Sequence, residues 1–62
     1  MKMRRFKASY SVSTFYEIEE DDPTFKEWDY TVETLKRAFY IDVFETGDEE
    51  AILNAIKIAE VD

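Results

Sequence analysis

The sequence predicts a small α+β domain: an antiparallel three-stranded sheet with one C-terminal helix packed on one face, in the order βββα. Residues 5–18 alternate between apolar and polar side chains, and two shorter alternating segments follow, all of which indicate strands. The last 17 residues, "TGDEEAILNAIKIAEVD", instead carry helix-start signals. A chain of 62 residues allows one domain, which we expect to span residues 1–62.

The first strand is expected over residues 5–18, "RFKASYSVSTFYEI". One parity carries Phe6, Ala8, Tyr10, Val12, Tyr16 and Ile18, and the serines lie on the other. At about 3.3 Å per residue such a strand is some 45 Å long. A domain of this size has a radius of gyration of about 11 Å. The strand must therefore bend, bulge or overhang its own sheet.

The middle of the chain is expected to form two more strands. "EDDPT" at residues 20–24 predicts a chain reversal, because the Asp side chains cap the chain locally and Pro23 fixes its own φ. The second strand carries the alternating apolar residues Trp28, Tyr30 and Val32, and the third carries Phe39, Ile41 and Val43. The connection at 33–37 has no Gly, Pro or Asn, so residues 31–39 can alternatively form a short helix with Val32, Leu35 and Phe39 on one face.

The C-terminal helix is expected to start at Thr46 or Asp48, either of which can serve as the N-cap. Acidic residues follow in the first turn, where they complement the helix dipole. The helix face would be made of Ile52, Leu53, Ile56 and Ala59. Residues 55–61, "AIKIAEV", also alternate well enough for a short final strand.

Side-chain parity divides the expected sheet into a helix-covered face and an open face. The covered face would hold Phe6, Tyr10, Val12, Tyr16, Ile18, Trp28, Tyr30, Val32, Phe39, Ile41 and Val43. The open face would hold the acids Glu17, Glu19, Glu27, Asp29 and Glu33, the serines Ser9, Ser11 and Ser13, and the aromatics Phe15, Tyr40 and Phe44. Crowded carboxylates beside exposed aromatics indicate a protein-binding face, and a plainly solvated surface is the alternative.

The charge pattern and composition restrict the function. The formal charge is −7, while residues 1–7 contain Lys2, Arg4, Arg5 and Lys7 and no acid. An acidic body repels nucleic acid and anionic membranes and favours basic protein surfaces, so we expect neither direct nucleic-acid binding nor membrane binding. No apolar run reaches the roughly 18 residues of a membrane span, and no signal peptide is evident, so a cytoplasmic location is expected.

Enzyme chemistry and cofactors are not expected. The chain has no Cys and no His, which removes disulfides, the usual zinc ligands and imidazole catalysis. The acids at 19–22 lack the ligand spacing and central glycine of an EF-hand loop, so no calcium site is expected there.

Two functions fit these features. The stretch "YIDVFETGDEEAILNAIKIAE" resembles a pattern seen in small phage and mobile-element proteins, without indicating one family. Small, acidic, aromatic-rich chains of this kind resemble stoichiometric inhibitors of nucleic-acid enzymes, including DNA mimics and some anti-CRISPR proteins. The first expectation is therefore an inhibitor that binds a basic surface on another protein. The alternative is a self-associating homodimer that pairs through the first strand.

Overall fold

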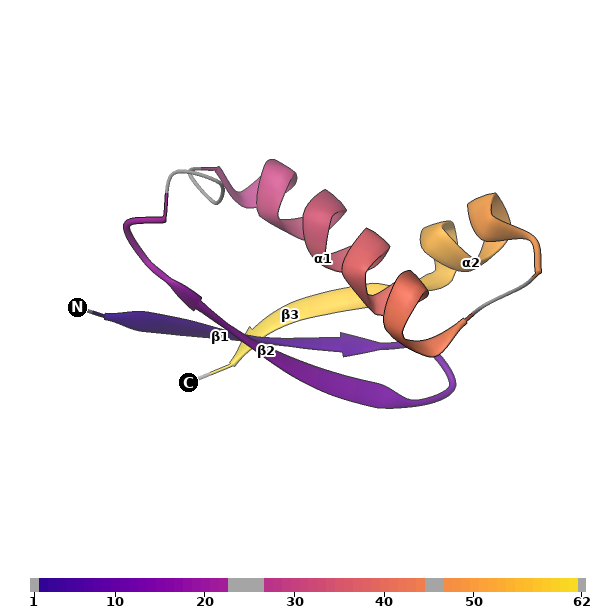
Figure 1. Ribbon diagram of the computed structural model, residues 1–62, viewed down its shortest axis with the longest axis horizontal. Helices are drawn as coiled ribbons and strands as arrows, with labels where there is room; N and C mark the ends of the chain where they lie inside the picture. The colour runs from indigo at the N-terminus through magenta and orange to yellow at the C-terminus, as the bar shows by residue number, and fades with distance from the viewer. Residues whose placement is uncertain (1, 23–26, 45–46, 62) are drawn as a thin grey trace.

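The computed structural model describes residues 2–22, 27–44 and 47–61, which form a sheet with two helices on one of its faces (Figure 1). The elements are β1 (Met3–Ser9), β2 (Ser13–Glu19), α1 (Trp28–Val43), α2 (Glu49–Ala55) and β3 (Lys57–Val61). The strands are antiparallel in the order β2-β1-β3. The α+β class and the three-stranded antiparallel sheet are confirmed. The βββα order is wrong, because the longer helix lies between strands and the chain ends in a strand.

The long alternating segment folds back on itself. It forms a β1–β2 hairpin whose three-residue turn is Tyr10–Ser11–Val12, and Ser9 faces Ser13 where the strands begin to pair. The amide of Tyr10 donates to the carbonyl oxygen of Val12 at 3.0 Å, which closes the turn. A reversal therefore replaces the expected bend, and it lets the segment fit a molecule 37 Å in its longest dimension.

The expected second and third strands are wrong, and the helical alternative for residues 31–39 is confirmed and extended. Residues 28–43 form α1, whose buried residues Thr31, Leu35 and Phe39 recur every four positions on one side. The buried Thr31 hydroxyl donates to the carbonyl oxygen of Glu27 at 3.0 Å, so burial leaves it satisfied. The decisive difference from a strand is Ile41, which is 73% exposed although it shares parity with Phe39.

The C-terminal region forms a shorter helix than expected, followed by the final strand that was the alternative. Asp48 is confirmed as the N-cap of α2, since its side chain accepts a hydrogen bond from the amide of Ala51. Gly47 precedes it with φ of +131°, a conformation that side-chain-bearing residues rarely adopt. Thr46 lies outside the described residues, as does Pro23 of the expected turn.

The core lies between β1 and the helices. Its buried apolar residues are Phe6, Ala8, Ile18, Leu35, Phe39 and Ile56. The parity expected for residues 5–18 holds in both strands, since Phe6, Ala8 and Ile18 all face the helices. Six residues expected in the core are exposed instead: Tyr10, Val12, Trp28, Tyr30, Ile41 and Ala59. Tyr10 and Val12 lie in the hairpin turn and Ala59 on the open sheet face, while Trp28 is exposed although its ring centroid lies 5.5 Å from that of Phe6.

A polar contact joins α1 to the edge strand β2. The Tyr16 hydroxyl donates to the Asp42 carboxylate, with 2.7 Å between Oη and Oδ2. Burial, together with this hydrogen bond, raises the pKa of Tyr16 above its usual value. This hydrogen bond links the C-terminal end of α1 to β2.

We predict that Phe39→Ala and Ile41→Ala differ sharply in stability. The Phe39 side chain is fully buried, so its truncation should lower the free energy of unfolding by about 3 to 5 kcal/mol. Truncation of the exposed Ile41 side chain should change the free energy of unfolding by no more than about 0.5 kcal/mol. Urea unfolding followed by circular dichroism measures both. Equal losses would contradict the helical assignment of residues 28–43.

Tyr16→Phe should lower the free energy of unfolding by about 0.5 to 1 kcal/mol at pH 7, because it removes the hydroxyl that donates a hydrogen bond to the Asp42 carboxylate. Since the folded-state pKa of Tyr16 is raised above the usual value of 10.0, this contribution is complete below about pH 10 and is lost at higher pH. Unfolding measured from about pH 8 to 11 should therefore show the two proteins converging. A constant difference across that range would contradict the role of the hydroxyl.

Candidate protein-binding surfaces

The open face of the sheet carries the side chains of odd-numbered residues from all three strands. The registers fix this arrangement: Met3 faces Glu19, Arg5 faces Glu17, and Lys7 faces Phe15 on β2 and Ala59 on β3. Because the helices lie on the other face, no described element covers these side chains (Figure 1).

The centre of the open face is a cation–aromatic pair. Phe15 lies on this face, where it was expected, and is 50% exposed; the Arg5 guanidinium carbon lies 4.6 Å from its ring centroid. Arg5 is also the direct cross-strand neighbour of Glu17. Sequence reasoning placed Glu17 and Phe15 on this face but missed Arg5 and Lys7, although their parity is that of Ser9.

The serines do not form the expected row. Ser9 and Ser13 face each other across the hairpin, at the end of β1 and the start of β2, while Ser11 lies in the turn. Because the chain reverses at residues 10–12, two of the three serines form a cross-strand pair beside the turn and not a row along one strand.

Tyr40 and Phe44 were expected on the open face, and this is wrong. Both are partly buried on the helical side of the sheet and pack against the cluster of Ala8, Phe39 and Ile56. The Phe44 ring lies 5.4 Å from that of Tyr10, 5.9 Å from that of Tyr40 and 6.1 Å from that of Phe39, measured between centroids. These aromatics close the core above the hairpin turn.

Glu27, Asp29 and Glu33 also lie away from the open face. Glu27 is the N-cap residue of α1, and the other two are exposed positions in that helix. They therefore belong to the helical layer, while Glu17 and Glu19 lie on the open face of β2. The expected five-carboxylate face is divided between two layers, because it required residues 27–33 to be a strand.

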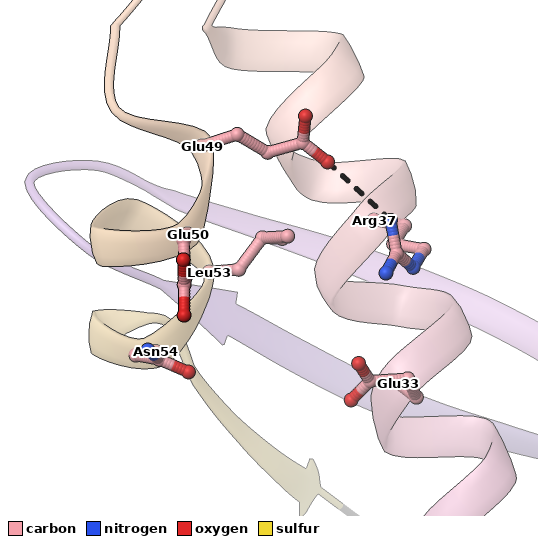
Figure 2. A pocket seen from close by; sticks show the side chains of 6 residues that line it. All are labelled: Glu33, Arg37, Glu49, Glu50, Leu53 and Asn54. Atoms are coloured by element: carbon pink, nitrogen blue, oxygen red, sulfur yellow. Dashed lines mark hydrogen bonds and ion pairs between the residues drawn. The ribbon is translucent and has the colours of Figure 1, made fainter.

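The helical layer contains a shallow acidic groove of about 310 Å³ between α1 and α2 (Figure 2). Its lining residues are Glu33, Arg37, Glu49, Glu50, Leu53 and Asn54. Arg37 donates to Glu49, with 3.3 Å between Nη1 and Oε1, and both side chains are more than half exposed. Glu33 lies one turn before Arg37 on the same helix. Among the described residues, neither Glu33 nor Glu50 forms an ion pair of its own.

Most residues that line this groove were not predicted as binding residues from the sequence. Glu33 alone among them was predicted on a binding face, and it was placed on a strand. The available signals were the spacing of Glu33 and Arg37 in the helical alternative and the acids in the first turn of the C-terminal helix.

A second hollow lies where β1 begins and β3 ends, and it shows how the N-terminal cations are used. Arg4 binds Glu60 through two hydrogen bonds, Nε to Oε1 at 3.0 Å and Nη2 to Oε2 at 2.9 Å. The hydrogen bond with Arg4 lowers the pKa of Glu60 below its usual range. This N-terminal cation is therefore the ion-pair partner of an acid on β3.

The described residues offer no arrangement of three or more Asp and Glu side chains that could hold a metal ion. Within the same residues, no helix has the length and apolar character needed to cross a membrane. Comparison with family models, curated proteins and solved structures finds no match to this chain. The function is therefore inferred from the charge and shape of these surfaces.

We predict that Glu17→Gln and Glu27→Gln act independently and that neither stabilises the fold. Glu17 faces Arg5, so removal of its charge should lower the free energy of unfolding by about 0.2 to 1 kcal/mol. Glu27 lies in the other layer, so the double variant should equal the sum of the singles. Urea unfolding of the three variants measures this. Single variants that each stabilise the fold, with a double variant that gains less than their sum, would show that the two carboxylates repel each other.

Proposed function

We propose that this chain is a non-enzymatic protein-binding module that acts as an acidic stoichiometric inhibitor of a nucleic-acid-binding enzyme, with its helical layer as the binding surface. The observation that carries the proposal is the groove between α1 and α2, whose lining has three carboxylates, Glu33, Glu49 and Glu50, and one cation, Arg37 (Figure 2).

The division of charge between the two layers supports the helical surface. Residues 27–55 contain eight acids, and their only cations are Lys36 and Arg37. The strands β1 and β3 instead carry Arg4, Arg5, Lys7 and Lys57. A basic surface that approaches this molecule is therefore attracted to the helices more than to the sheet.

The groove suits a cationic side chain better than a small apolar ligand. Its volume is at the low end of the range of about 300 to 1,000 Å³ for small-molecule sites. Its lining has three carboxylates and one apolar side chain, Leu53. An entering Lys or Arg finds Glu33 and Glu50 available among the described residues and can compete with Arg37 for Glu49.

Inhibition follows from occupancy of a shared surface. An enzyme that binds nucleic acid presents Lys and Arg side chains along the path of the phosphates. An acidic helical layer bound there excludes the nucleic acid without any chemistry of its own. Such complexes form fast and weaken with added salt, since the attraction acts over about a Debye length.

Two variants with the same change in net charge test the surface. Glu33→Gln/Glu50→Gln removes two charges from the groove, and Glu17→Gln/Glu19→Gln removes two from the open sheet face. Tagged native and variant proteins are used to capture partners from a lysate at about 50 mM salt, where electrostatic attraction is strong. Each captured enzyme is then assayed on its nucleic-acid substrate against increasing amounts of each protein.

The expected result is inhibition that is complete at one equivalent of native protein and of the sheet-face variant. The groove variant should require about tenfold more protein, which corresponds to about 1.4 kcal/mol of binding free energy. Equal loss in both variants would contradict the helical layer as the binding surface. Capture of no nucleic-acid enzyme would contradict the inhibitor function.

A further inference from the structure

The outer edge of β2 exposes backbone hydrogen-bonding groups. The amide of Glu20 donates to the carbonyl oxygen of Lys2 at 2.9 Å, and that of Tyr10 donates to Val12. In an antiparallel pair, hydrogen-bonded positions alternate with non-bonded ones, so the even-numbered residues of β2 bond to β1. The odd-numbered residues therefore point their N–H and C=O groups outward: Ser13, Phe15, Glu17 and Glu19.

The outer edge of β3 exposes fewer backbone hydrogen-bonding groups than that of β2. Odd-numbered β1 residues face β3, so the outward groups of that strand are those of Ile58 and Glu60. The strand has five residues, and the Glu60 side chain, on its helix-facing side, is held by Arg4. Short length and an inward-facing charge are features that discourage edge pairing.

β2 is less protected as an edge strand, because its two charged residues, Glu17 and Glu19, lie on the open face and not on the inward, helix-facing side. Its seven residues, STFYEIE, contain no Pro, Gly or Lys, and aromatic and β-branched residues make up four of them. No described strand pairs with its outer edge. β1 is the central strand, so pairing between copies through the first alternating segment has to use its second half, β2.

We propose that the outer edge of β2 binds a second copy of this chain, strand to strand and antiparallel, about a two-fold axis at Tyr16. This register sets Ser13 opposite Glu19 of the second copy and Phe15 opposite Glu17. It joins all four outward-facing residues of each strand in hydrogen-bonded pairs. It also keeps side-chain parity, so the helix-facing side chains of both copies remain on one face of a continuous six-stranded sheet.

Charge selects this register and favours a second copy. A shift by one pair in one direction places Glu17 opposite its own counterpart, and a shift in the other direction leaves Glu19 unpaired. The central register places Glu17 beside Phe15 of the second copy, whose ring carries an Arg5 guanidinium at 4.6 Å. The Glu17 carboxylate of each copy thereby meets a cation–aromatic pair of the other, and the strand is complementary to itself, as a two-fold interface requires.

This inference is independent of the proposed inhibitor function, because it concerns the sheet edge and not the helical layer. The test is the mass in solution of the native chain and two variants at one position. Glu17→Pro removes an outward N–H that β1 does not use, and Glu17→Thr keeps the N–H while removing the same charge. Circular dichroism shows whether each variant keeps the native fold.

Sedimentation of the native chain between about 10 μM and 1 mM should show a mass that rises from 7.4 kDa toward twice that value. Glu17→Thr should still dimerise, and Glu17→Pro should remain at 7.4 kDa. A native chain that stays monomeric at about 1 mM would overturn the proposal, as would a folded Glu17→Pro variant that still dimerises.

Amide hydrogen exchange on the native chain gives an answer that does not depend on any variant. The amides of Phe15 and Glu17 have no partner strand in the monomer, so they should exchange fast in dilute protein. At dimer-forming concentration their exchange should slow by about tenfold or more, together with those of Ser13 and Glu19. Unchanged exchange at these amides in a dimeric sample would place the interface elsewhere and overturn the proposal.

Discussion

The rest of the structure depends on the reversal of the chain at Tyr10–Ser11–Val12. An alternating segment of 14 residues cannot remain one straight strand in a domain whose radius of gyration is 11.7 Å. Folding it in half makes β1 the neighbour of β2 and sets even-numbered residues of both strands toward the helices. Phe6, Ala8 and Ile18 are thereby gathered on one face, and α1 has an apolar surface to cover.

The same reversal decides where the charges lie. Because β1 is central, its cations share the sheet with Glu17 and Glu60 and compensate them, as Arg4 does through two hydrogen bonds. Eight of the other thirteen acids lie in residues 27–55, the part of the sequence that contains both helices. A chain that reads as one acidic body with a basic start thus becomes a mixed-charge sheet under an acidic helical layer, and these two layers suit different partners.

Sequence reasoning succeeded where alternation is local and failed where it had to choose between periods. The parity of Phe6, Tyr16 and Ile18 and the Asp48 N-cap were predictable, because a period of two and a capping residue are visible within a few positions.

Residues 28–43 were not predictable in the same way, since their apolar residues fit both a strand and a helix. Only packing decides, by burying Leu35 with Phe39 and leaving Ile41 outside. The predicted binding face depended on the same choice, because Glu27, Asp29 and Glu33 lie beside Glu17 only if residues 27–33 form a strand.

The acidic helical layer and the free β2 edge fit together geometrically. Pairing through β2 about an axis perpendicular to the sheet leaves the helices of both copies on the same side, as Figure 1 shows for one copy. A dimer formed this way presents two acidic grooves side by side. A partner with an extended basic surface can engage both, and the second contact then forms at the high effective concentration set by the first. A stack of two open sheet faces would instead point the grooves in opposite directions and offer such a partner only one. The proposed edge pairing would therefore let a 62-residue chain cover a basic surface wider than its own.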